Sequence, residues 1–153
     1  MSTSKVSFGA ILALGGTGAI VSVLAASLFM AYQAVPNVGV VKAVGVSVYW
    51  DRDCTRNVTQ INWGYIEPGE ASNVTVYIKN EGNIPLVLTM RTEDWNPLSA
   101  SSCIGLTWNR EEYVLKARST VSAVFTLSLV PEIEGITDFS FDILIIGAES
   151  TYS

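Results

Sequence analysis

Carboxylates, two cysteines and two Asn-x-Thr acceptors are the groups of this 153-residue chain that could do chemistry, and the chain has no histidine. Without histidine, a Ser-His-Asp or Cys-His arrangement is excluded. Paired carboxylates serve glycosidases, but nothing here sets the separation of two of them. We predict solvated loop charges, with a calcium site assembled from several loops as the alternative, for the acidic clusters at 51–53, 93–94, 111–112 and 132–134. We therefore expect no catalytic residue, no cofactor and no resident metal.

Cys54 and Cys103 are the two cysteines, and their spacing is not that of a C-x-x-C motif. A zinc site is disfavoured, because the chain offers no histidine ligand. The sequence predicts a Cys54–Cys103 disulfide in an oxidising compartment, with two unpaired core thiols as the alternative. Closing a loop of about 50 residues would stabilise the fold by roughly 4 kcal/mol.

Asn57 and Asn73 each begin an Asn-x-Thr glycosylation acceptor, which matters only if this part of the chain is exported. Asn73 lies in an alternating segment and is expected on its solvent face. Together with the disulfide, the acceptors predict an outward-facing domain.

The chain has four tryptophans, of which Trp50 and Trp63 fit a buried core. Trp95 is followed by Asn96-Pro97 in a predicted loop. It is the candidate exposed anchor for a sugar or protein partner, because tryptophan often dominates binding energy at interfaces. A core position is the alternative for Trp95.

Residues 6–41 contain no charged side chain. The apolar run over residues 8–34 would span roughly 40 Å as a helix, against a hydrocarbon core of about 30 Å. Pro36 should end this helix. The run therefore predicts a transmembrane helix that is retained as an anchor. Removal as a secretory signal is the alternative, disfavoured because only Lys5 precedes the run as a basic residue and no A-x-A-like site ends it.

Small side chains recur at intervals of four within this run, which favours close packing of helices in lipid. They are Gly15, Gly18, Ala19, Ser22 and Ala26. We expect membrane lipids or like helices as partners and a homo-oligomer as the state, although small residues are also common in any membrane helix.

All 14 acidic residues lie after Val41 together with 8 of the 9 basic ones, so this part carries 8 − 14 = −6 charges. A net negative domain disfavours nucleic acid as a partner. We predict a hydrophobic helix and linker over residues 1–41 and one domain with a single core over residues 42–153.

Period-two alternation predicts the strands of this domain. They are expected at residues 42–50, 58–63, 73–79, 86–90, 104–108, 113–116, 120–130 and 137–147. Seven or eight antiparallel strands with turn residues between them indicate a mainly β, immunoglobulin-like sandwich, with a small open barrel as the alternative. The last strand is apolar on both faces in its second half, as in a central strand or an edge that accepts a neighbour's strand.

The strand, Pro-Gly turn, strand and Asn-rich turn over residues 61–70 and 73–83, after a hydrophobic helix, resemble archaeal exported immunoglobulin-like domains. The pattern is also similar to biofilm-fibre subunits of the TasA and camelysin type and, more distantly, to archaeal pilin and archaellum stator sandwiches. The resemblance covers residues 42–147 and implies a structural surface protein. Lys5-Val6-Ser7 departs from the charged, Gly-ended leader of archaeal pilins.

These observations predict a non-catalytic extracytoplasmic protein, either a single-pass membrane protein or a subunit of a surface filament. The filament would assemble through the helix or by donation of a strand after Pro36. The alternative is an accessory module that binds a sugar or protein of the envelope.

Overall fold

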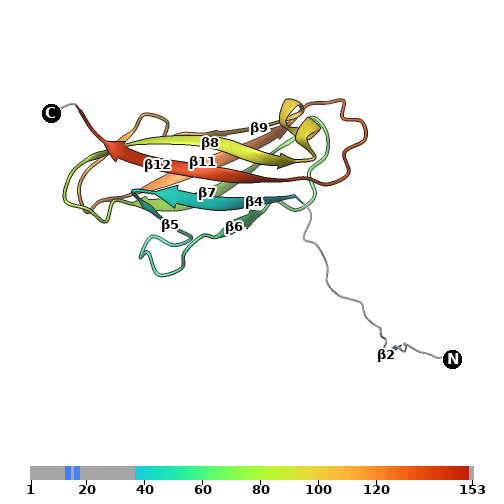
Figure 1. The fold of residues 1–153 in the computed structure, drawn as a ribbon, viewed down its shortest axis with the longest axis horizontal. Coiled ribbons are helices and arrows are strands. Elements are labelled where there is room, and N and C mark those ends of the chain that lie inside the picture. The colour runs from blue at the N-terminus through green and yellow to red at the C-terminus, as the bar shows by residue number, and fades with distance from the viewer. Residues whose placement is uncertain (1–12, 15, 18–36, 152–153) are drawn as a thin grey trace. The chain divides into compact units, whose positions relative to one another are not determined.

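The computed structural model describes residues 13–14, 16–17 and 37–151 (Figure 1). Four described residues fall in the predicted N-terminal helix, and they form an antiparallel pair of two-residue strands, β1 (Ala13–Leu14) and β2 (Gly16–Thr17). The rest of that helix lies outside the described residues, as do all the predicted packing positions, Gly15, Gly18, Ala19, Ser22 and Ala26. Within the described part of the chain, no helix is long and apolar enough to cross a membrane.

Residues 37–151 form two sheets packed face to face, which confirms the mainly β, immunoglobulin-like sandwich (Figure 1). The five-stranded sheet has the order β10 (Val114–Leu115), β8 (Leu86–Asn96), β12 (Ser140–Glu149), β4 (Val38–Val44), β6 (Gln60–Asn62). The four-stranded sheet has the order β5 (Ser47–Tyr49), β7 (Ala71–Lys79), β11 (Thr120–Leu129), β9 (Ile104–Trp108). A short 3-10 helix, η1 (Leu98–Ser102), joins β8 to β9.

The core is built from the alternating apolar rows of the long strands. Phe125 and Leu127 of β11 are fully buried against Ile143 and Ile145 of β12, as the period-two pattern predicts. Trp63 is buried in the same core, and Trp50 packs partly buried against it. The buried rows from both sheets therefore fill the space between them.

The predicted strand over residues 42–50 is in fact two strands in different sheets. Gly45 adopts φ +83°, and a Cβ there would lie 2.3 Å from the carbonyl oxygen of Gly147. The chain turns at this residue and passes from β4 to β5, which raises the strand count of the sandwich from the predicted seven or eight to nine. Val44 is 56% exposed, although the alternation predicts it inward.

The first sandwich strand begins before the predicted domain boundary. β4 starts at Val38, four residues before the predicted start of the domain at residue 42. β4 pairs in parallel with β12 from Ser140↔Val38 to Ile146↔Val44, and antiparallel with β6. The parallel pair corrects the expectation of a purely antiparallel sandwich. Because the segment after Pro36 is paired within its own domain, the predicted donation of this strand to a neighbour is not seen.

β12 is a central strand, with β8 on one side and β4 on the other. The edge interpretation of this strand is therefore wrong, and its central interpretation is confirmed. Leu144 and Ile146 on its outer face are half-buried, which accounts for the apolar pattern on both faces.

Candidate functional site

The proximal end of the sandwich, where the chain enters β4, consists of Asn37 and the loops at 63–70, 97–103 and 130–139. Asn37 is 93% buried and adopts φ +62°, a conformation that asparagine tolerates better than most residues. Its amide donates to the Gly64 carbonyl at 2.6 Å, and its Oδ1 accepts from the Phe139 amide at 3.2 Å. Its carbonyl accepts from Trp63 N at 2.9 Å. This one residue ties the entering chain to two loops.

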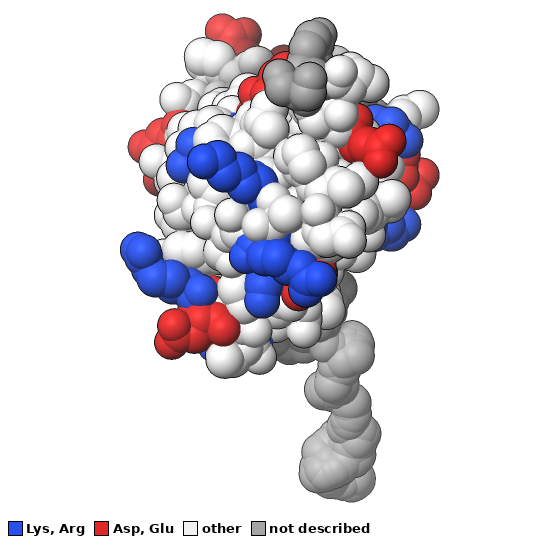
Figure 2. Space-filling view, turned by 90° about the vertical axis from the view of Figure 1, so that its left-hand side faces the viewer, with Lys and Arg blue, Asp and Glu red and all other residues white. Residues whose placement is uncertain are grey.

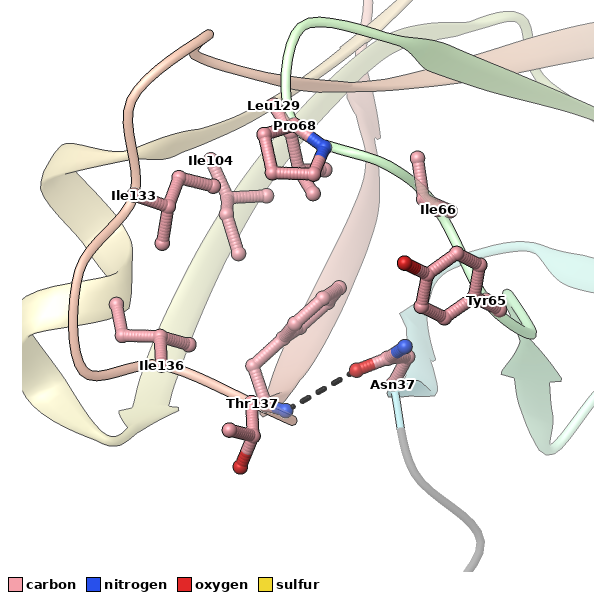
Figure 3. Close-up of a pocket in the computed structure, with 10 residues that line it drawn as sticks. Asn37, Tyr65, Ile66, Pro68, Ile104, Leu129, Ile133, Ile136 and Thr137 are labelled. Atoms are coloured by element: carbon pink, nitrogen blue, oxygen red, sulfur yellow. Dashed lines mark hydrogen bonds between the residues drawn. The ribbon is translucent and has the colours of Figure 1, made fainter.

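An apolar cavity of about 310 Å³, the proximal pocket, opens beside Asn37. Pro68, Ile104, Ile133 and Ile136 converge on one side, and Tyr65 and Asn37 lie on the other (Figure 3). Leu129, Ile66, Thr137 and Phe139 complete the lining. The volume is at the small end of ligand sites, which run from about 300 to 1,000 Å³. A hollow of this size and lining suits an apolar side chain or small apolar group.

Four carboxylate residues are next in sequence to lining residues of the proximal pocket. Glu67 lies between two lining residues, Glu132 and Glu134 flank Ile133, and Asp138 precedes Phe139. All four are exposed. The three loops of the proximal end contain no Lys or Arg, so all charged side chains on these loops are negative.

The distal end, where β4 and β12 finish, is built around a second buried asparagine. Asn80 is fully buried, and its Nδ2 lies within hydrogen-bonding distance of the Ile84, Leu115 and Lys116 carbonyls at 2.7, 3.2 and 3.3 Å. Its Oδ1 accepts from Gly82 N at 2.9 Å. These contacts join the loop before β8 to the loop before β11.

The joined loops carry an exposed apolar side chain and two exposed cations, and also Glu81, which pairs with Lys79. Ile84 is 41% exposed, and Lys116 and Arg118 are exposed beside it along the same pair of loops. Figure 2, which views this end of the sandwich, shows Lys and Arg side chains across its middle, with Asp and Glu side chains beside and around them. We call Ile84, Lys116 and Arg118 the distal tip.

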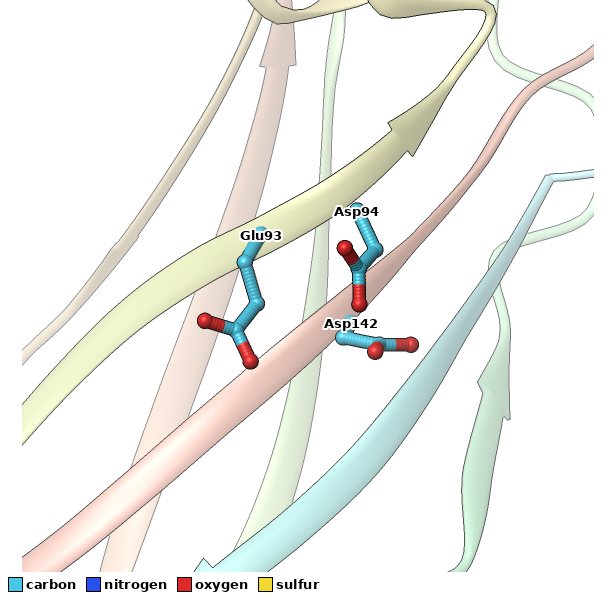
Figure 4. Close-up of side chains that lie close together, drawn as sticks. All are labelled: Glu93, Asp94 and Asp142. Atoms are coloured by element: carbon cyan, nitrogen blue, oxygen red, sulfur yellow. The ribbon is translucent and has the colours of Figure 1, made fainter.

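A third cluster, of carboxylates, lies on the outer face of the five-stranded sheet (Figure 4). The pairing shifts between Asp142↔Glu93 and Ser140↔Asn96, so β8 carries one extra residue there. This bulge, with Asp94 at φ +55°, brings Glu93 and Asp94 beside Asp142. Carboxylate oxygens of the three lie within 4.8 Å of one another. Sequence patterns do not predict this cluster, because it depends on the bulge.

Lys42 compensates part of this negative charge. Its ammonium donates to Asp142 Oδ2 at 2.6 Å, which lowers the pKa of Asp142. The pKa of Asp94 is raised, mainly by its hydrogen bond with Asp142 and secondly by the negative charge of Asp142. Hard cations prefer oxygen ligands of this kind. Because Lys42 already neutralises Asp142, we assign no metal site to the cluster.

The predicted Cys54–Cys103 disulfide is wrong for this structure, in which both thiols are free. Cys54 Sγ lies 3.7 Å from Thr120 Oγ1, at the start of β11, and the Cys103 carbonyl accepts from Val130 N, just after its end. Nine residues of extended strand separate those positions by about 30 Å. A disulfide needs Cα atoms within about 7 Å, so these two thiols cannot pair within one chain.

Trp95 is not the exposed anchor that its sequence position suggests. It continues β8 and is half-buried, with its ring stacked on Phe141 at 4.2 Å between centroids. Its Nε1 donates to Thr92 Oγ1 at 3.2 Å. Asn57 and Asn73 are both exposed, as glycosylation acceptors must be, and Asn73 lies on the outer face of β7 as predicted.

The residues that sequence reasoning missed are those of the two ends. Asn37 was assigned to a linker, and Asn80 was placed in an Asn-rich turn without a buried role. The lining of the proximal pocket comes from four segments far apart in the chain. The one available signal is the run of acidic residues around isolated isoleucines at 132–136.

No protein-family model and no curated protein matches this sequence. Among solved structures, the chain is similar to the ASH / PapD-like domain of human CEP192 (PapD-like domain 7), at 9% sequence identity and a TM-score of 0.39. The match covers 84% of this chain and 96% of that chain.

Proposed function

We propose that this is a non-catalytic surface protein whose apolar N-terminal segment holds the immunoglobulin-like sandwich outside the cell membrane for structural or adhesive contact. The junction at Asn37 is the observation that carries the proposal. Only Val35 and Pro36 separate the apolar run of the sequence from Asn37, which three hydrogen bonds hold in the proximal end. Flexible tethers use longer Gly/Ser-rich linkers. So direct a connection suits an anchor or an assembly element.

Fractionation of the native protein tests the anchor. We expect the chain to remain with membranes through alkaline extraction, because the apolar run is long enough to span the bilayer. Since Cys54 and Cys103 are the only thiols, a membrane-impermeant maleimide applied to intact cells reports which side the domain occupies. Release by alkali, together with labelling only after lysis, would exclude this function.

A sharper form of the proposal makes the chain a subunit of a surface filament. Electron microscopy of native material distinguishes the two forms of the proposal. Single anchored particles, with no filaments, would exclude the filament form. Intact-mass spectrometry of the same material reports N-terminal processing and any glycan on Asn57 or Asn73.

An accessory envelope-binding module is the second candidate, and the proximal pocket favours it. In that case Ile136→Asp, which places a charge in the apolar lining, abolishes partner capture. Trp95→Ala has a smaller effect, because its ring packs on Phe141. Equal capture by wild type and Ile136→Asp would remove this candidate.

A further inference from the structure

The two ends of the sandwich are complementary in shape, polarity and charge. The proximal end has an apolar pocket and exposed carboxylates on the same loops, whereas the distal end carries Ile84, 41% exposed, on the pair of loops that also carries Lys116 and Arg118. We propose that copies of this chain associate end to end, with the distal tip of one copy seated in the proximal pocket of the next. This inference deepens the filament form of the proposed function and rests on it.

The distal tip is preorganised for docking. Asn80 bonds to the carbonyls of both Ile84 and Lys116, and Arg118 N donates to the Gly82 carbonyl at 3.2 Å. The three side chains of the tip therefore leave from one hydrogen-bonded unit. A surface already ordered before binding loses little conformational entropy when it docks.

The proximal pocket matches one apolar side chain. Its volume of about 310 Å³ is small, and isoleucine, leucine and phenylalanine side chains dominate its lining. Ile84 is exposed in the free domain at a cost in hydration that burial would remove. Seating Ile84 would bring Lys116 and Arg118 to the mouth of the pocket.

The charges at the two surfaces favour a second copy as the occupant. Glu67, Glu132 and Glu134, exposed on the loops of the proximal end, are opposite in sign to Lys116 and Arg118 of the tip. Among the residues that the structure describes, neither tip cation belongs to an ion pair. Complementary potentials guide encounter and fix orientation.

The contact uses two different surfaces of the same chain, so it is heterologous. A heterologous contact that does not close into a ring produces an open-ended assembly. A symmetric contact would instead place acidic loops against acidic loops, or basic tip against basic tip. The arrangement therefore predicts a linear series of domains in one orientation.

The native cysteines report this arrangement, because Cys54 lies beside the distal end and Cys103 beside the proximal end. The full chain in mild detergent is treated with a short bis-maleimide crosslinker. We expect a ladder at multiples of 16.5 kDa. Cys54→Ser and Cys103→Ser should each lose the ladder, and mixing the two variants should return a dimer only. Crosslinks that persist in either variant alone would show like-to-like contact and overturn the proposal.

Charge exchange tests the two surfaces directly. The double variants K116E/R118E and E132K/E134K should each lose the ladder, and an equimolar mixture should restore it, because each then offers the complement of the other. E112K/E149K makes the same change of charge away from the proximal pocket, with Glu149 paired to Leu86 at the distal end, and should keep the ladder because it leaves the proximal loops acidic and the tip basic. Ile84→Asp should lose it. A ladder that survives charge reversal, or a wild-type chain that stays monomeric, contradicts this contact.

Failure of this inference is separable from failure of the proposed function. A chain that stays with membranes through alkaline extraction, and is labelled from outside, but forms no ladder retains its anchor and lacks the end-to-end contact. A chain that forms the ladder but is released by alkali shows the opposite result.

Discussion

At each end of the sandwich a buried asparagine holds the loops together, but the two ends present different surfaces: an apolar pocket at the proximal end and an exposed isoleucine with two cations at the distal end. Among the described residues, Asn37 and Asn80 are the buried polar side chains, and each holds loops from different parts of the chain. Asn37 forms part of the wall of the proximal pocket, whereas Asn80 holds the loops of the distal tip by hydrogen bonds. Buried polar networks that are fully hydrogen-bonded make the surrounding structure specific and rigid. The comparison teaches that rigid ends do not need disulfides in this fold.

The largest expected loss of stability is at the distal end of β4, where Gly45 lies against Gly147 of β12. Gly45→Ala places a Cβ 2.3 Å from the Gly147 carbonyl oxygen on a backbone with φ +83°. The left-handed strain and the overlap should together lower the free energy of unfolding by about 4 kcal/mol. Urea denaturation measures the loss.

Gly135→Ala is the matched change at the proximal end. Gly135 also has a positive φ, +76°, but a Cβ there meets nothing within 4 Å. We expect a loss of about 1 kcal/mol, from backbone strain alone. Equal losses for the two variants would show that the contact with Gly147 does not matter.

Asn80→Ala should lower the free energy of unfolding by about 3 kcal/mol. It leaves three carbonyls and the Gly82 amide without their side-chain partner, in a site with no access to solvent at Asn80 itself. Amide hydrogen exchange should increase at residues 80–85 and 116–119 and stay unchanged at 63–70. Uniform acceleration throughout the domain would contradict a local fastening role.

Asn37→Gly should cost less, about 1.5 kcal/mol. The change removes two side-chain hydrogen bonds but keeps a residue that accepts φ +62°. Thermal unfolding measures the loss. Asn83→Gly, at an exposed turn position, is the control and should change stability by less than about 0.5 kcal/mol.

Lys42→Met tests the charges on the sheet face between the two ends. Because Lys42 lowers the pKa of Asp142, its removal should raise that pKa, which carbon-detected NMR titration follows directly. A lowered folded-state pKa stabilises the fold above the ordinary aspartate pKa and loses its effect as pH falls through the folded value. The free energy of unfolding of the variant should therefore be lower than that of wild type at neutral pH, and the difference should shrink in acid. An unchanged Asp142 titration would show that the ion pair does not form.

The smallest expected effect is that of reduction. Because both thiols are free, adding a reductant should leave the melting temperature of the monomer unchanged. A Cys54–Cys103 disulfide would instead contribute roughly 4 kcal/mol, and its reduction would lower the melting temperature by many degrees. Thiol titration of the unfolded, non-reduced chain provides the independent count.

The strand β11 could be predicted from sequence because apolar and polar side chains alternate along its ten residues, whereas β8, predicted to end at Met90, continues to Asn96. β9 was predicted at Ile104–Trp108, as observed, and β11 to within one residue. The alternation through Val44, Val46 and Val48 misled, because it continues across Gly45, where the backbone turns. The predicted strand began only at residue 42, so Val38–Val41, the first part of β4, was assigned to the linker after the hydrophobic helix.

The candidate site could not be predicted, because its parts meet only in three dimensions. The pocket combines residues 37, 65–68, 104 and 129–139, and none of these segments carries a motif. The cysteine error has the same origin: separation along the sequence says nothing about which end of β11 each thiol occupies.

The parallel pairing of β4 with β12 has a mechanical consequence. A load between residue 37 and the end of β12 pulls the two strands in opposite directions along their length. The ladder from Val38↔Ser140 to Val44↔Ile146 would then resist in shear, with its hydrogen bonds strained together and not opened one after another. A domain held by its first strand and pulled from its far end would withstand far more tension than a hairpin unzipped from its turn.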